Sequence, residues 1–135
     1  MNVRISETRD ISLQSILDLY KANEWSAAEK PTQLYQALMD SHSLVSAWVG
    51  EDLVGLGNAI SDGHLVVYYP HLLVHPHYHG RGIGRMIMDQ MQETYGAFHM
   101  QILTADGKAI DFYQKVGFER AGETEPMWIY KGNEH

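Results

Sequence analysis

The residues with the clearest chemical potential lie mid-chain, where the apolar run Leu72–Val74 leads through His75-Pro76 into a glycine-rich turn. Gly80, Gly82 and Gly84 then open a segment with helical apolar periodicity. A glycine-rich entry into a helix leaves several backbone N–H groups free, and the helix dipole adds partial positive charge there. Such a nest holds phosphate or pyrophosphate. The stretch therefore predicts a phosphorylated cofactor.

Three kinds of phosphate loop compete for this stretch. A Walker-type loop needs Lys and Ser or Thr after its last glycine, whereas Arg85 and Met86 follow Gly84 here. A dinucleotide fingerprint has the spacing G-x-G-x-x-G, whereas this chain has G-x-G-x-G. That fingerprint also has an acidic residue about twenty positions further on, and Asp106 stands there in this chain. The remaining interpretation is the pyrophosphate loop of an acyl-coenzyme A binder.

Two segments together resemble the GNAT superfamily of N-acetyltransferases. The family motif Gln/Arg-x-x-Gly-x-Gly/Ala overlies His79–Gly84, with His79 in place of the usual Gln or Arg. Ala109–Phe118 matches a second motif, in which an alanine, a Phe-Tyr pair, a basic residue and Gly-Phe follow one another. The resemblance implies transfer of acetyl from acetyl-CoA to a primary amine of a small molecule or peptide. The alternative function is a non-catalytic acyl-CoA-binding module on the same fold. A third possibility is a transferase that uses a longer acyl-CoA.

The resemblance also implies a set of cofactor-binding residues. The backbone of Leu73 and Val74 would pair with the pantetheine arm, and Asp106 stands where many relatives carry an asparagine that contacts the cofactor. Asp106 also suits a helix N-cap, which we favour. The pyrophosphate would lie on the loop and its flanking arginine, that is on His79, Gly80, Arg81, Gly82, Ile83, Gly84 and Arg85.

Two side chains are candidates for proton transfer. Tyr113 occupies the family position that often donates to the sulfur of coenzyme A, and a phenol with a pKa near 10 stays protonated at neutral pH. His71 is the preferred general base, because an imidazole with a pKa near 6.5 suits proton abstraction. Other base candidates are a water chain and four further side chains: Glu24, Asp62, His64 and Tyr68.

The resemblance implies an acceptor pocket on the side opposite the cofactor, walled by the loop between the first two helices and by a terminal hairpin. Trp25, Met127 and Trp128 are its candidate lining residues, since aromatic walls suit an amine cation. No metal is expected, because the alternating His75, His77 and His79 lack a completing ligand set and Pro76 interrupts them.

Bulk properties narrow the class of protein. The formal net charge of −7 disfavours nucleic acid as a partner, and the absence of cysteine excludes a thiol carrier of the acetyl group. With no apolar run long enough to span a membrane and no signal peptide, we expect no membrane partner and a cytoplasmic location. A homodimer stays an open alternative, because dimers are common on small folds of this kind.

The apolar periodicity predicts one α/β (α+β) domain over residues 1–135 with the order β-α-α-β-β-β-α-β-α-β-β. This is the order of the GNAT fold, a mixed, mostly antiparallel sheet flanked by helices. A single strand is expected over Leu65–Val74, and the helix after the glycines should bury Ile83, Met86, Ile87, Gln90 and Met91. The chain should end in a hairpin of Phe118–Ala121 and Met127–Lys131.

Overall fold

The computed structural model describes residues 2–132. Its elements are β1 (Arg4–Ser6), α1 (Leu13–Ala22), the 3₁₀ turn η1 (Ser26–Glu29), α2 (Pro31–Met39), β2 (Ser43–Val49), β3 (Asp52–Ser61), β4 (Val66–Tyr68), β5 (Leu72–Val74), the 3₁₀ turn η2 (Pro76–Tyr78), α3 (Ile83–Tyr95), β6 (Met100–Ile102) and α4 (Ala109–Lys115). Within these residues, none of the helices combines the length and apolar character needed to cross a membrane.

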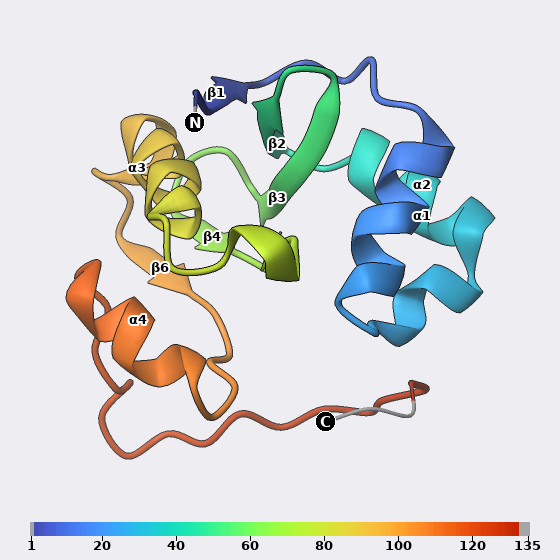
Figure 1. The fold of residues 1–135 in the computed structure, drawn as a ribbon. Helices are drawn as coiled ribbons and strands as arrows, with labels where there is room; N and C mark the ends of the chain where they lie inside the picture. Colours follow the sequence, from blue (N-terminus) through green and yellow to red (C-terminus); the bar gives the residue numbers. More distant parts are fainter. Residues whose placement is uncertain (1, 133–135) are drawn as a thin grey trace.

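The sheet is mixed and mostly antiparallel, as expected. Its strands follow the spatial order β1-β2-β3-β4-β6, with antiparallel pairs throughout except for the parallel pair of β4 and β6. β5 lies off this path and pairs with β3. Helix α3 packs on one face of the sheet, and α1 and α2 lie on the other side (Figure 1).

Two apolar clusters fill the space on either side of the sheet. Neighbouring residues of one strand serve opposite clusters, because side chains alternate across a strand: Leu44 packs toward α1 and α2, whereas Val45 packs toward α3. On α3 the buried residues are Ile83, Ile87, Met88, Met91 and Tyr95. Met88 therefore takes the core position that was expected for Met86, and Met86 and Gln90 are only half-buried.

The strand expected over Leu65–Val74 is wrong, because it divides into β4 and β5. β3 pairs with β4 through Ile60 and Ser61 and with β5 through residues 55–57, so one long strand supports both pieces. The interruption contains Pro70, which has no backbone N–H to donate to a sheet. It is fixed by Asn58, whose N–H donates to the His71 carbonyl at 3.1 Å and whose Oδ1 accepts from the His71 N–H at 3.1 Å.

The expected terminal hairpin is also wrong, since residues 119–132 form neither helix nor strand. Gly122 has a φ of +60°, and the Thr124 N–H donates to the Ala121 carbonyl at 3.1 Å, so the chain turns locally. Met127 and Ile129 are 93% and 91% exposed, which shows that no sheet face covers them. In Figure 1 this segment runs beneath the sheet, from α4 toward the side of α1.

Candidate active site

The glycine loop joins β5 to α3 and has the backbone of an anion nest. Gly80 and Gly82 have φ values of +77° and +79°, a left-handed conformation that only glycine adopts freely. The first helical bond runs from the Met86 N–H to the Gly82 carbonyl at 3.0 Å. The N–H groups of residues 83–85 therefore have no acceptor within the helix. A Cβ on either glycine would meet nothing within 4 Å, so the loop is open to a ligand.

Gly84 has a different role from its two neighbours. A Cβ at this position would lie 3.2 Å from Phe112 Cζ, so the absent side chain lets α4 approach α3. The Arg85 guanidinium is turned toward the Lys115 carbonyl, at 3.5 Å, which is the end of α4. Arg81 lies over the Tyr78 ring, with its Cζ 5.4 Å from the ring centroid. Of the loop residues, Gly80 and Gly82 thus have the geometry most specific to phosphate.

The His79 side chain closes the loop onto the preceding strand. Its Nε2 lies 2.8 Å from the Val74 carbonyl oxygen, which identifies this nitrogen as the donor. The imidazole therefore ties the glycine loop to the end of β5. The departure from Gln or Arg at this position leaves the backbone nest in place.

The outer edge of β5 is open because β6 pairs only with β4. The hydrogen bonds that join residues 58 to 71 and 54 to 75 show which residues face β3. In an antiparallel ladder these pairs alternate, so Leu73 also turns its N–H and C=O toward β3, and Leu72 and Val74 turn theirs outward. This corrects the expected role of Leu73, whose side chain is also buried. Leu72, which was not singled out from the sequence, has outward backbone groups instead, and the two-residue period of a strand is the signal that could have indicated it.

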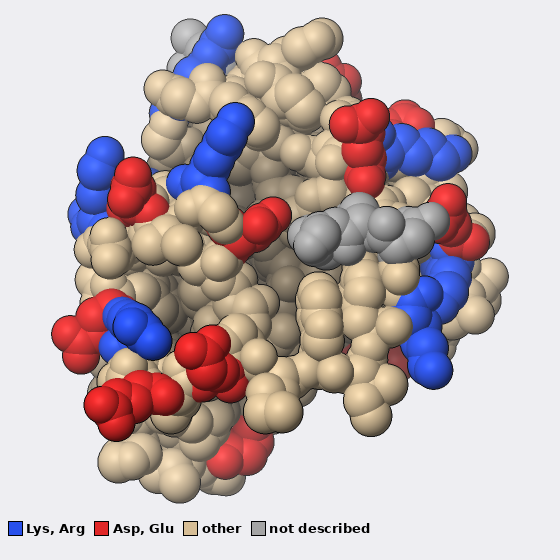
Figure 2. Space-filling model, turned by 90° about the horizontal axis from the view of Figure 1, so that it is seen from below, with Lys and Arg blue, Asp and Glu red and all other residues tan. Residues whose placement is uncertain are grey.

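A groove of about 990 Å³ lies next to this open edge. It brings together residues from four parts of the chain: the segment before α2, the divided strand, the start and face of α4, and the C-terminal segment. Figure 2 shows the same underside of the molecule, where a hollow with mostly uncharged walls has charged side chains around its rim. The predicted site residues among those that line it are Trp25, His71, Asp106, Tyr113, Met127 and Trp128.

Tyr113 lies on α4 between two phenyl rings, with ring centroids 5.0 Å from Phe112 and 5.7 Å from Phe118. The Phe118 N–H donates to the Tyr113 carbonyl at 2.9 Å, and Gly117 permits this turn with a φ of +107°. Burial raises the pKa of the Tyr113 phenol to about 12, so the group is protonated at neutral pH. Its hydroxyl has no hydrogen-bond partner among residues 2–132, which leaves it available to a ligand in the groove.

His71 forms an aromatic cluster with Tyr20 and Trp25. The Tyr20 hydroxyl lies 2.8 Å from His71 Nδ1, and the Trp25 ring meets the imidazole edge to face at a centroid distance of 5.2 Å. Burial lowers the pKa of His71 to about 4, so the ring is neutral at physiological pH. Tyr20 was not identified from the sequence as a partner of His71, because the two residues are 51 positions apart in the chain.

Asp106 lines the groove but does not cap α4. The residue at the N-cap position is Lys108, and the Asp106 carbonyl accepts from the Ala109 N–H at 2.6 Å. The favoured helix-cap role is therefore wrong. A cofactor contact by the Asp106 side chain stays a prediction, as do the substrate contacts of Met127 and Trp128.

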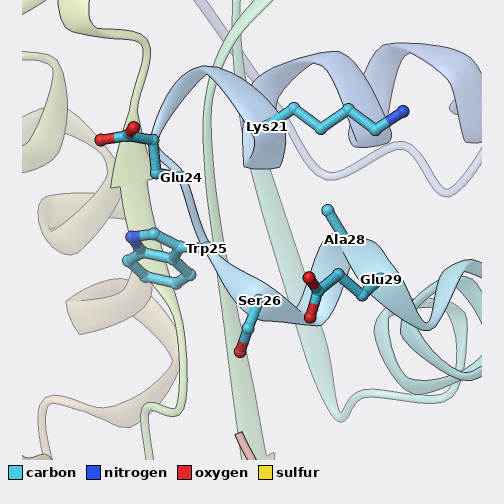
Figure 3. A pocket seen from close by; sticks show the side chains of 6 residues that line it. All are labelled: Lys21, Glu24, Trp25, Ser26, Ala28 and Glu29. Carbon is cyan, nitrogen blue, oxygen red and sulfur yellow. The ribbon is translucent and has the colours of Figure 1, made fainter. Parts of the chain in front are cut away.

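A smaller hollow of about 260 Å³ adjoins the groove at Trp25. Figure 3 shows its lining from α1, from η1 and from the turn between them, with the carboxylates of Glu24 in the turn and Glu29 in η1. Glu24 has a φ of +58° at the end of α1, and the Trp25 N–H donates to the Tyr20 carbonyl at 3.1 Å. This is the Schellman position that glycine usually occupies.

Of the remaining base candidates, Asp62 and His64 do not line the groove, whereas Tyr68 does. Asp62 caps a turn, since its Oδ1 accepts from the N–H groups of His64 and Leu65, both at 2.8 Å. In the part of the chain that the structure describes, no three His, Asp or Glu side chains gather as metal ligands.

The comparisons with known proteins agree with this geometry. The family model described as an acetyltransferase (GNAT) domain matches residues 7–127. The acetyltransferase GNAT family protein SP0256 from Streptococcus pneumoniae superposes with a TM-score of 0.82 at 29% identity, covering 96% of this chain and 99% of that one. AAC(6')-Iy in complex with the bisubstrate analogue CoA-S-monomethyl-acetylneamine has a TM-score of 0.71 at 16% identity, covering 98% and 99%.

Two relatives by sequence are themselves uncharacterised. The N-acetyltransferase ycf52 of Porphyra purpurea is 24% identical over 87% of this chain and 70% of its own length. ML0378 of Mycobacterium leprae is 32% identical over 74% of this chain, and the match spans 28% of that protein. Because the family match covers most of the residues and the fold agrees, the chain belongs to the GNAT acetyltransferase family.

Proposed function

We propose that this protein transfers an acetyl group from acetyl-CoA to a primary amine of a small molecule or peptide. The observation that carries the proposal is the combination of an open anion nest at Gly80 and Gly82 with a Tyr113 hydroxyl that lines the groove and has no hydrogen-bond partner among residues 2–132. AAC(6')-Iy, which has the same fold, holds an analogue that contains coenzyme A. We extend coenzyme A binding to this chain on that basis.

The residues fit a coenzyme A thioester along one path. The free N–H groups at the start of α3 suit the pyrophosphate, because they combine hydrogen-bond donors with the positive end of the helix dipole. The outward N–H and C=O of Leu72 and the outward N–H of Val74 suit the amides of the pantetheine arm, whereas the Val74 carbonyl already accepts from His79. Tyr113 and His71 line the groove, where the thioester and the amine would meet.

In the proposed reaction the amine nitrogen bonds to the acetyl carbon while the carbon–sulfur bond breaks. The Tyr113 hydroxyl gives its proton to the departing sulfur and regains one from solvent. A cationic amine first gives one proton to solvent, and the attacking nitrogen gives a second proton to water as it becomes an amide. The attack is direct, because the chain has no cysteine to carry the acetyl group.

Carboxylates and an indole near the groove support an amine cation as the acceptor. Glu29 and Trp25 line both the groove and the smaller hollow, with Glu24 and Lys21 in the hollow and Lys30 and Lys131 in the groove (Figure 3). Carboxylates beside an indole favour a cationic ligand through charge and the face of the aromatic ring. The net charge of −7 adds attraction at longer range.

Calorimetric titration with acetyl-CoA and free coenzyme A, with NAD and ATP as controls, tests the cofactor. Thiol release with a panel of amines then tests the transfer. Tyr113→Phe should lower turnover by about 10²-fold or more, the usual loss when a general acid is removed, with cofactor affinity nearly unchanged. Tyr35→Phe is the matched control, since the Tyr35 hydroxyl bonds the Ile11 carbonyl away from the groove.

The outcomes separate two functions. Saturable binding of acetyl-CoA and coenzyme A with amine-dependent thiol release supports the transferase. Binding without thiol release from any amine favours a non-catalytic acyl-CoA-binding module on the same fold. Unchanged turnover in Tyr113→Phe would remove this residue from the mechanism.

A further inference from the structure

The hydroxyl of Tyr20 is buried on α1 with one partner. The side chain is 0% exposed, and in the described part of the chain its hydroxyl bonds only His71 Nδ1, at 2.8 Å. A hydroxyl that is taken out of water without a hydrogen bond destabilises the folded protein. The direction of this one bond is therefore set by what each atom can donate and accept.

Two arrangements of protons are possible for a neutral imidazole. If Nδ1 carried the proton, it would donate to the Tyr20 oxygen, and the hydroxyl proton would have no acceptor in its buried position. If Nδ1 carries the lone pair, the hydroxyl donates to it and both atoms are satisfied. Since burial raises the pKa of Tyr20, the phenol keeps its proton. Tyr20 thus favours the tautomer of His71 that carries its proton on Nε2.

The backbone and ring of His71 are held as firmly as its tautomer. Asn58 bonds both the N–H and the carbonyl of His71, at 3.1 Å each. Trp25 packs edge to face on the imidazole and also lines the groove. Nε2 has no partner among residues 2–132, so it is free to meet a ligand.

We propose that His71 donates a hydrogen bond from Nε2 to an oxygen of a substrate in the groove, and that Tyr20 is the positioning residue that fixes this tautomer. The proposal rests on the proposed function, because the groove must receive substrates. It changes the role that the sequence suggested for His71: a nitrogen that already carries a proton cannot take one from the amine. The amine proton leaves to water in this scheme, and His71 supplies orientation or carbonyl polarisation.

Nuclear magnetic resonance tests the tautomer without any need for activity. Long-range ¹H–¹⁵N correlation of labelled protein at neutral pH shows which ring nitrogen of each neutral histidine bears hydrogen, and loss of a signal in His71→Gln assigns His71. We expect Nε2–H in the wild type, a mixture of tautomers in Tyr20→Phe, and no change in Tyr35→Phe. Nδ1–H in the wild type would overturn the proposal, whether or not the protein transfers acetyl groups.

The same signals identify the oxygen. A change on addition of acetyl-CoA but not of coenzyme A assigns the bond to the thioester carbonyl. A change that needs an active amine assigns the bond to the acceptor. If neither acetyl-CoA nor an active amine alters the His71 signals, the donor role is refuted.

Kinetics supply the functional arm, because glutamine can donate a hydrogen bond but cannot act as a base. His71→Gln should keep kcat/KM within a few-fold of the wild type, whereas His71→Leu should lose about tenfold or more, which is what one hydrogen bond of about 1.4 kcal/mol is worth. An equal and large loss in both folded variants would restore His71 as a base and overturn the proposal.

Discussion

Gly82→Val should abolish tight coenzyme A binding, and Gly50→Val should not. Both glycines have left-handed backbones, with φ values of +79° and +59°, and a Cβ at either position meets nothing within 4 Å. The two substitutions therefore impose similar local strain, of about 1–2 kcal/mol, and similar losses of stability. The two glycines differ in location, because Gly82 is the N-cap of α3 whereas Gly50 lies in the turn between β2 and β3.

The size of the binding loss follows from the nest. A valine that leaves the left-handed region turns the neighbouring N–H groups away from a phosphate. Hydrogen bonds to a charged group contribute about 1.5–3 kcal/mol each. Losing even one weakens binding by about tenfold or more, since 1.4 kcal/mol corresponds to a factor of ten.

Calorimetric titration with acetyl-CoA measures the affinities, and urea unfolding measures the stabilities. The reasoning is refuted if Gly82→Val binds as tightly as the wild type. It is equally refuted if Gly50→Val loses binding to the same extent, because general destabilisation would then explain the loss.

The packing of Gly84, the strained Glu24 and the buried His71 each give a measurable expectation. Gly84→Ala should lower the free energy of unfolding by about 1 kcal/mol, because the new methyl group would press on the Phe112 ring. In urea unfolding, adding Phe112→Leu should recover most of the lost stability, and no recovery would contradict the contact. Glu24→Gly should raise the free energy of unfolding by up to about 1 kcal/mol, because it relieves a φ of +58°, and Glu24→Ala should not. The folded-state pKa of His71 is lowered from 6.5 to about 4, so its contribution to the free energy of unfolding is present above pH 6.5 and is lost as the pH falls toward 4. Unfolding measured at a series of pH values should show a flatter pH dependence of that free energy in His71→Gln.

The glycine loop was predictable because its chemistry is local. Gly80 and Gly82 have the positive φ values that their spacing before a periodic helix suggested. The position of Gly117 was predictable for the same reason, since a glycine after a helix commonly ends it in a left-handed turn. Such features depend on a few consecutive residues and on steric rules that hold in any fold.

The divided strand and the missing hairpin depend on distant partners. Pro70 was a visible warning against one continuous strand, because proline is rare in the middle of a sheet. The exact interruption, however, is set by Asn58 from a neighbouring strand. The apolar and aromatic run Met127–Tyr130 resembled a strand, but a strand needs an edge to pair with, and the sequence pattern does not supply one.

His79 shows how the site can depart from the family pattern and keep its geometry. In this chain the anion nest consists of backbone N–H groups, so the side chain that precedes the glycines need not touch the phosphate. His79 instead donates to the Val74 carbonyl at 2.8 Å, which links the loop to the end of β5. Val74 turns this carbonyl outward because Leu73 faces β3, so the position of the loop is coupled to the register of the strand. The requirement at this position is therefore a side chain that can donate a hydrogen bond to the Val74 carbonyl. His79→Gln should bind coenzyme A about as tightly as the wild type, whereas His79→Leu should bind it less tightly.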